Sequence, residues 1–164
     1  AKNIKGLAKA FKALGYEVTV LADADSPENF SPADEAELVK LGVPVVAWDN
    51  KLSLEERAMK DLPWGAVLAS VQLAQTEFAY PVRDQVYSRL FAKIELAQEV
   101  EKWVESENLR TAIGLAAKKS EWFKNISKGD RWFSAAAPSF EDADFAKKDL
   151  SVKLNKLWAW IERV

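Results

Sequence analysis

Residues 18–27, Val-Thr-Val-Leu-Ala-Asp-Ala-Asp-Ser-Pro, decide how the rest of this sequence is interpreted. A short, apolar, β-branched run that stops at two acids and a proline is typical of a buried strand. Because side chains alternate along a strand, we expect the side chains of Asp23 and Asp25 to point to the same face at its carboxyl end. Neighbouring carboxylates are hard oxygen ligands of the kind that bind Mg²⁺ or Mn²⁺. Asp-Ser-Pro is also a good turn sequence, so an acidic turn without a metal is the alternative.

The composition removes several classes of mechanism. The 164 residues include no cysteine and no histidine, which excludes thiol nucleophiles, Ser-His-Asp triads, Cys/His zinc sites and histidine bases within this chain. A formal net charge of -2 gives no overall basic field for nucleic acid, although basic residues crowd into positions 118–131. No apolar stretch is long enough for a membrane helix and the N-terminus does not resemble a signal peptide, so we expect a cytoplasmic protein. Any catalysis must use carboxylates, lysines or hydroxyls with a bound hard metal.

The first part of the sequence alternates helix and strand. The expected elements are a helix over 4–14 ended by Gly15, a strand over 18–22, a helix from Pro32 to Leu41 with Ser31 as its N-cap, and a strand over 43–48. Pro44 cannot donate a ladder hydrogen bond, which indicates a position near a sheet edge. This order predicts a parallel α/β sheet. Because two strands do not form a stable parallel sheet, we expect the first strand of the fold to lie outside this sequence or to come from another segment.

From Pro63 onward the pattern is helical. A helix is already expected over 54–62, and after Pro63 the expected helices cover 64–77, 81–93, 95–105, 107–119 and a long final stretch, 141–164. We therefore expect an α/β core over 1–63, a helical insertion module over 64–120, and a return to the core with a C-terminal helix over 121–164. Trp122 and Phe123 lie among lysines, where aromatic side chains either stack on bases or anchor a loop on the core; we favour the anchor.

Glu55 and Glu56 open the helix that follows the second strand. Glu56 has a sufficient structural role, because it would complete a capping box with Ser53. Glu55 has no such role. The helix that it opens should start near the sheet edge that carries Asp23 and Asp25, because parallel strands share one carboxyl edge. Three carboxylates at that edge would form a divalent-metal site for phosphoryl transfer, with a basic residue on the phosphate.

These motifs, taken in order, resemble the Toprim part of the OLD (overcoming lysogenization defect) family nucleases, in the class with a helical insertion after the acidic motifs. The resemblance rests on residues 12–27, on the Leu-Gly-Val-Pro-Val-Val-Ala-Trp of 41–48, on the Leu-Ser-Leu-Glu-Glu-Arg of 52–57 and on the Asp-Leu-Pro-Trp of 61–64, and more loosely on 109–129. It implies an α/β fold, a Toprim-like parallel sheet with an all-α helical module. Toprim nucleases of this family carry a Glu-Gly-x-Thr-Glu motif on a first strand, which this sequence lacks, so the sheet and the metal site are expected to be incomplete.

The resemblance implies a metal-dependent DNA endonuclease that hydrolyses phosphodiesters by a two-metal mechanism with Mg²⁺ or Mn²⁺. Asp23 and Asp25 are implied to bind the catalytic metal, and Glu55 is implied to contribute to a second metal position. The family joins this region to an upstream ABC-type ATPase, so DNA and an ATPase region of the same parent protein are the implied partners.

A lysine beyond the helical module returns to the active site in this family. Lys124 matches that position best, with Lys119 as the reserve, and its implied role is to contact the phosphate or the transition state. Lys119, Lys124 and Lys128 are together the expected DNA contacts.

Two other functions stay open. The first is a Mg²⁺-dependent aspartate phosphatase or phosphoacceptor, in which one aspartate of the strand end is a covalent nucleophile. The second is a non-catalytic oligomerisation or docking module, because an amphipathic helix over 141–164 with Trp158 and Trp160 suits pairing with a copy of itself. A homodimer is compatible with the nuclease as well.

Overall fold

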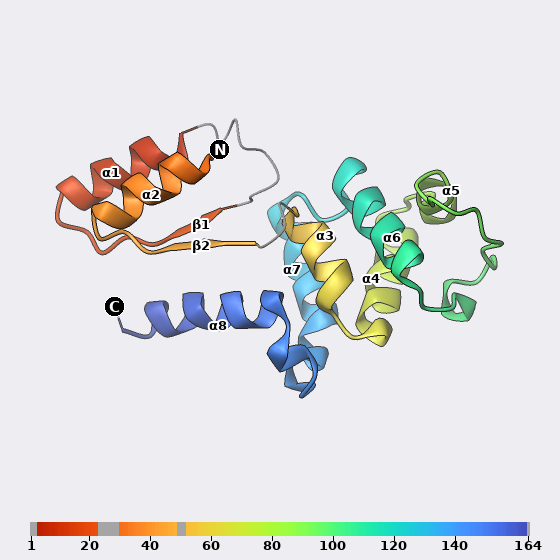
Figure 1. Ribbon diagram of the computed structural model, residues 1–164. Coiled ribbons are helices and arrows are strands. Elements are labelled where there is room, and N and C mark those ends of the chain that lie inside the picture. The colour runs from red at the N-terminus through yellow and green to blue at the C-terminus, as the bar shows by residue number, and fades with distance from the viewer. Residues whose placement is uncertain (1–2, 23–29, 49–51, 164) are drawn as a thin grey trace. The chain divides into compact units, whose positions relative to one another are not determined.

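The computed structural model describes residues 3–22, 30–48 and 52–163 (Figure 1). The chain forms two compact units. Ala1–Leu54 and Asp149–Val164 form the first, called the sheet unit, and Glu55–Lys148 form the second, called the helical unit. Within the described residues, no helix combines the length and the apolar character needed to cross a membrane.

The sheet unit contains a small parallel sheet. Its elements are α1 (Ile4–Ala13), β1 (Val20–Ala22), α2 (Pro32–Lys40), β2 (Val45–Ala47) and α8 (Asp149–Ile161). The two strands pair in parallel, with Val20 opposite Val45 and Ala22 opposite Ala47. The backbone N–H of Val20 and the hydroxyl of Thr19 both donate to the carbonyl of Pro44, at 2.9 and 3.1 Å. The predicted α/β class and the parallel pairing are therefore confirmed for the described residues.

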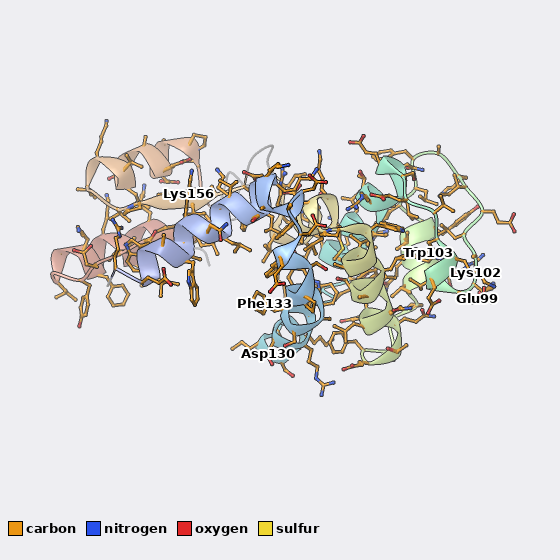
Figure 2. The ribbon with its side chains drawn as sticks, turned by 90° about the horizontal axis from the view of Figure 1, so that it is seen from below. Glu99, Lys102, Trp103, Asp130, Phe133 and Lys156 are labelled. Carbon is orange, nitrogen blue, oxygen red and sulfur yellow. The ribbon has the colours of Figure 1, made fainter. Side chains whose placement is uncertain are left out.

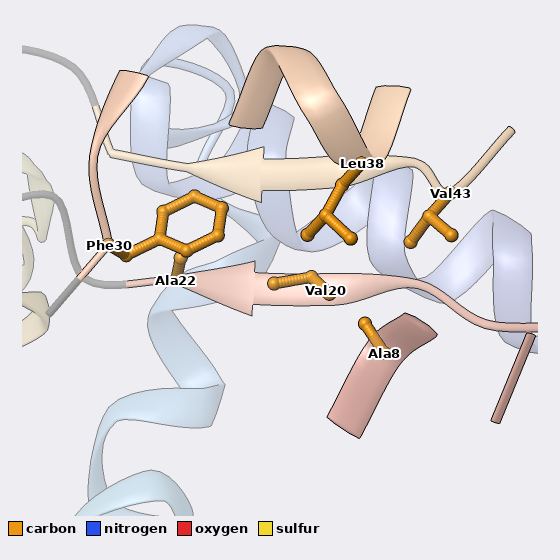
Figure 3. Close-up of a cluster of buried hydrophobic side chains, with 6 residues drawn as sticks. All are labelled: Ala8, Val20, Ala22, Phe30, Leu38 and Val43. Atoms are coloured by element: carbon orange, nitrogen blue, oxygen red, sulfur yellow. The ribbon is translucent and has the colours of Figure 1, made fainter. Parts of the chain in front are cut away.

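Side chains alternate between the two faces of the sheet along each strand, and different helices pack on the two faces. One face packs against α1 and α2 through a cluster of six buried side chains (Figure 3), namely Ala8, Val20, Ala22, Phe30, Leu38 and Val43. Leu21 and Val46 lie on the other face, where Val46 is buried and Leu21 remains 42% exposed. On that side α8 contacts β2, and Figure 1 shows α8 across the sheet from α1 and α2.

The helix ends in this unit follow local sequence. Gly15 and Gly42 follow α1 and α2 with φ of +87° and +70°, a left-handed conformation that a side chain would strain. At the start of α2, the Ser31 hydroxyl accepts the Asp34 N–H at 3.2 Å and the Asp34 carboxylate accepts the Ser31 N–H at 2.9 Å. This reciprocal capping box explains why the helix begins at Pro32.

Acid is expected to weaken the sheet unit through Asp34. Hydrogen bonds from Lys5 and then from Ser31 hold the pKa of the Asp34 carboxyl well below its usual range. Because this pKa is depressed in the folded state, the carboxylate stabilises the fold above its unfolded pKa of about 3.9, and the contribution is lost as the pH falls below that value. Thermal unfolding followed by circular dichroism should therefore show a falling midpoint between about pH 5 and pH 3.

The control is Asp34→Asn, which keeps the size of the side chain. Its midpoint at pH 7 should be lower, because Lys5 loses a charged partner. Its decline between about pH 5 and pH 3 should be shallower than that of the wild type. Equal pH slopes for the two proteins would rule out Asp34 as a source of the acid sensitivity.

The helical unit contains the remaining elements. They are α3 (Leu54–Asp61, whose first residue lies at the unit boundary), α4 (Trp64–Thr76), α5 (Val82–Tyr87), α6 (Glu107–Lys119), α7 (Ile126–Ala136) and three 3₁₀ turns, η2 (Val100–Lys102), η3 (Ala137–Glu141) and η4 (Phe145–Lys147). Here α4 packs against α7 and α5 packs against α6. Val67 and Val71 from α4 and Ile113 from α6 are fully buried.

Three predicted helices are wrong in extent. Residues 95–105 are irregular apart from η2, around which Figure 2 labels Glu99, Lys102 and Trp103. Leu96, Val100 and Trp103 are nevertheless all buried. Their spacing imitates a helical period, but they reach the core from a loop in which the Trp103 indole N–H donates to the carbonyl of Ala97 at 2.9 Å. The helix predicted over 81–93 ends at Tyr87.

The final helix begins at Asp149 rather than at position 141. Pro138 lies in η3, and the Asp142 carboxylate then accepts the backbone N–H groups of Asp144 and Phe145, at 2.9 and 2.8 Å, ahead of η4. These short turns replace the first part of the expected helix.

The division into units also differs from the expected boundaries at 63/64 and 120/121. The structure groups 55–148 together and returns to the sheet unit only with α8. The reason for the second difference is that Trp122 and α7 pack in the helical unit, where Trp122 is fully buried and α7 contacts α4.

Candidate active site

The candidate site begins at the carboxyl end of β1. Asp23 and Asp25 lie outside the described residues, but β1 ends at Ala22, immediately before them in the sequence. Because β1 and β2 run parallel, both strands end at the same edge of the sheet. In open α/β sheets this is the edge at which ligands bind.

The acidic residues that follow β2 open α3. Glu55 and Glu56 both lie in the first turn of this helix and are half-buried. Acids in the first turn interact favourably with the positive end of the helix dipole. Because Glu55 is only half-buried, its carboxylate stays accessible, and it carries the kind of oxygen donor that a hard cation requires.

Glu56 has a contact that the sequence did not predict. Its carboxylate Oε2 accepts a hydrogen bond from Nζ of Lys118, in the last turn of α6, at 2.9 Å. The two side chains are 15% and 30% exposed, so this ion pair is partly shielded from water. Lys118 is thus the lysine of the 118–131 cluster that the structure connects to the acids of α3.

The other predicted lysines have different surroundings. Lys119 ends α6 and Lys124 follows in the turn before α7, and both side chains are exposed. Among the described hydrogen bonds and ion pairs, none joins Lys119 or Lys124 to Glu55 or Glu56. Their exposure leaves both available to a polyanion.

Lys128 lies in an aromatic setting. Its Nζ donates to the hydroxyl of Tyr80 at 2.8 Å and lies 4.7 Å from the centroid of the Tyr80 ring and 5.2 Å from that of Phe78. Arg131, also in the basic cluster, forms an ion pair with Glu77. Part of the basic cluster is therefore paired with other side chains of the helical unit.

The interpretation of Trp122 and Phe123 as loop anchors is confirmed. Trp122 is fully buried and its indole N–H donates to Oε1 of Gln85 at 2.7 Å. Phe123 is 7% exposed and stacks on Trp132, with ring centroids 5.1 Å apart. The two rings fix the turn from which Lys124 projects.

The tripeptide Asp-Ala-Asp occurs a second time, at 142–144. There Asp142 caps the turn before η4, and Asp144 is 89% exposed and pairs with Lys147 at 3.2 Å. The second copy therefore has a structural role that accounts for its sequence. The strand before Asp23, rather than the tripeptide, distinguishes the candidate metal ligands.

Within the described ranges, no group of three or more acidic side chains is placed to hold a metal ion. The pair Asp23 and Asp25 falls outside those ranges. Comparison with protein-family models, curated proteins and solved structures gives no match for this chain. The likeness to OLD family nucleases therefore stays a prediction from the sequence motifs.

Proposed function

We propose that this chain is a metal-dependent DNA endonuclease region that hydrolyses phosphodiesters with Mg²⁺ or Mn²⁺. The observation that carries the proposal is the parallel pairing of β1 with β2. It supports a ligand-binding edge at the carboxyl end of β1, directly before Asp23 and Asp25. In a chain without cysteine or histidine, an all-carboxylate donor set fits a hard divalent cation.

The residues have separate roles in this proposal. Asp23 and Asp25 would hold the catalytic metal, and Glu55 would supply a carboxylate to a second metal position. When bound, such ions activate water and neutralise charge on the phosphate. Lys124, with Lys119 as the alternative, would contact the DNA phosphate, which its exposed position allows.

The wider setting follows from the same proposal. DNA is the substrate, an ATPase region of a longer parent protein is the partner, and the location is cytoplasmic. The Toprim-like character of the sheet also belongs to the proposal, because the described residues contain two strands. A homodimer is compatible with all of these.

Metal-dependent nicking tests the proposal. The chain, joined to an upstream strand that carries the Glu-Gly-x-Thr-Glu motif, is incubated with supercoiled plasmid and Mn²⁺, Mg²⁺ or EDTA, and Mn²⁺ binding is measured by electron paramagnetic resonance on the same preparation. We expect saturable Mn²⁺ binding and conversion of plasmid to the open circle with Mn²⁺ or Mg²⁺ alone. A protein that binds no Mn²⁺ at millimolar concentrations, or nicking that persists in EDTA, would contradict the proposal.

A second function uses the same strand end. In an aspartate phosphatase or phosphoacceptor, an oxygen of Asp23 or Asp25 would attack the phosphorus, form an aspartyl-phosphate and release the leaving group. The parallel pairing of β1 with β2 supports this as well, because the attacking carboxylate would lie at the ligand-binding edge of the sheet. Acid-stable radiolabel on the protein after incubation with labelled acetyl phosphate would favour it over the nuclease.

A further inference from the structure

An open pocket of about 300 Å³ lies in the helical unit, lined by the carboxyl end of α3 and the segment around η4. Its lining residues fall within 60–64, 105–110 and 142–148, so the pocket belongs to one unit. The volume is at the lower end of the range that small-molecule sites occupy. We call it the α3–η4 pocket, and the charges around it indicate the kind of ligand that it fits.

The four carboxylates of the lining are already engaged within the helical unit. The partners are Arg57 for Asp61, Arg110 for Glu105, Lys147 for Asp144, and the backbone N–H groups of Asp144 and Phe145 for Asp142. Because three of these carboxylates face a cation of the protein itself, their repulsion of an incoming anion is reduced.

Two lysines of the same lining have no acidic partner among the described residues. Lys60 lies in the last turn of α3 and Lys148 directly follows η4, and both are exposed. Neither ammonium group forms an ion pair or a hydrogen bond within the part of the chain that the structure describes. These two groups are therefore the uncompensated charges of the pocket, and both are positive.

Arg110 removes an obstacle to an anion at the end of α3. The carboxyl end of a helix carries partial negative charge on carbonyls that lack helical partners. Nη1 of Arg110 donates to carbonyl oxygens at this end, those of Met59 at 2.7 Å and of Leu62 at 2.9 Å. The first turn of α4, which starts at Trp64 in the same lining, contains no acidic residue. The backbone around the pocket therefore does not oppose a negative ligand.

Trp64 gives the pocket an aromatic wall. Its side chain is half-buried, and the Arg110 guanidinium lies 5.4 Å from the centroid of its ring. Pro63 beside it is also half-buried and lines the pocket. A planar ring of a ligand can pack against such a wall, because stacking on an aromatic side chain needs only a flat π-face.

We propose that the α3–η4 pocket binds a small phosphate monoester that carries a planar ring, with Lys60 and Lys148 on the phosphate and Trp64 against the ring. A phosphate monoester has a charge of about −1.5 to −2 at neutral pH, which matches two lysines better than a single carboxylate does. Nucleoside monophosphates combine these two groups. The proposal goes beyond the nuclease function and does not depend on it, because these three residues have no role in that function.

Calorimetric titration of the full chain tests the proposal. The ligands are adenosine monophosphate, inorganic phosphate and adenosine, at low ionic strength and without divalent metal. Lys60→Gln, Lys148→Gln and the double variant remove the two charges, Lys60→Arg keeps one of them, and Trp64→Leu removes the ring. Lys102→Gln is the matched control, because Lys102 is an exposed lysine of the same unit (Figure 2) whose ion pair with Glu99, at 3.2 Å, lies outside the pocket lining.

We expect adenosine monophosphate to bind saturably and about 10-fold more tightly than inorganic phosphate, because only the nucleotide also reaches Trp64. Lys60→Gln and Lys148→Gln should each weaken its binding about 10-fold, since each removes a charge-assisted hydrogen bond. Lys60→Arg and Lys102→Gln should stay within about threefold of the wild type. Trp64→Leu should reduce the affinity for adenosine monophosphate to that for inorganic phosphate.

Four results would contradict the proposal. The absence of saturable adenosine monophosphate binding at millimolar concentrations would remove the site, and unchanged affinity in the double lysine variant would place the ligand elsewhere. Equal binding of adenosine would show that the phosphate contributes nothing. Equal affinities for adenosine monophosphate and inorganic phosphate would overturn the role of Trp64. Because Lys60 and Lys148 are exposed, their variants should fold as the wild type does by circular dichroism, so a loss of binding reports on the pocket.

Discussion

Replacing Asp23 and Asp25 together by asparagine is expected to abolish metal-dependent nicking and to weaken Mn²⁺ binding by more than about 100-fold. Asparagine keeps the size of each side chain but removes the negative charge that a divalent cation requires. The loss should exceed the 10- to 100-fold change that is typical of residues behind the metal ligands. Mn²⁺ titration and plasmid relaxation measure the two effects on the same protein.

The chain contains its own control for this experiment. Asp142→Asn with Asp144→Asn changes the same Asp-Ala-Asp tripeptide at a site where Asp142 caps the turn before η4. Asparagine accepts backbone hydrogen bonds as aspartate does, so folding should be retained. Metal binding and nicking should equal those of the wild type.

The pair of double variants gives a clear decision. Loss of activity in the Asp23 and Asp25 variant alone supports the metal site at the end of β1. Equal activity in all three proteins would remove these two residues from the site. Equal loss in both double variants would show that the assay responds to total acidic charge instead of to a particular pair.

Replacing Trp122 by alanine is expected to destabilise the helical unit by about 3–5 kcal/mol, the range typical of a large aromatic side chain deleted from a core. Trp122 is fully buried, stacks near Tyr80 with ring centroids 6.4 Å apart and donates to Gln85 at 2.7 Å. Alanine would leave a cavity and an amide oxygen without this donor. Urea unfolding followed by far-ultraviolet circular dichroism measures the loss.

Two variants make the result specific. Trp122→Phe keeps most of the volume and should lose less than the alanine variant, because it removes mainly the hydrogen bond to Gln85. Trp158→Ala, on α8, changes a side chain that is 60% exposed and should cost less than about 1 kcal/mol. Similar losses at Trp122 and Trp158 would contradict the role of Trp122 as the anchor of its loop.

Local chemistry explains why part of the fold could be predicted. Gly15 and Gly42 end helices because they take a left-handed backbone conformation, and Ser31 starts one because its hydroxyl caps the N–H of Asp34. The helix over 107–119 was predicted with its observed bounds, and Ser106 caps it by accepting the N–H of Leu109 at 3.2 Å. These features depend on a few consecutive residues.

The spacing of apolar residues gave a wrong helix prediction where the buried side chains belong to a loop. Leu96, Val100 and Trp103 have helical spacing, but the structure buries them from an irregular segment. Burial depends on where the chain passes, and a buried residue in a loop leaves the same apolar signal as one on a helix. The predicted start of the final helix, at 141, was wrong because Asp142 caps a short turn there.

The sequence by itself determined the α/β class of the first unit, the parallel direction of its two strands and most helix ends, because strand alternation, caps and glycine turns are local. It also supplied the acidic and basic candidates, Asp23, Asp25, Glu55, Lys119, Lys124 and Lys128. Only the tertiary structure decided which lysine meets the acids of α3. Lys118 and Lys119 are adjacent and chemically identical, but only the helix face that carries Gly114 allows the close approach that brings Lys118 to Glu56.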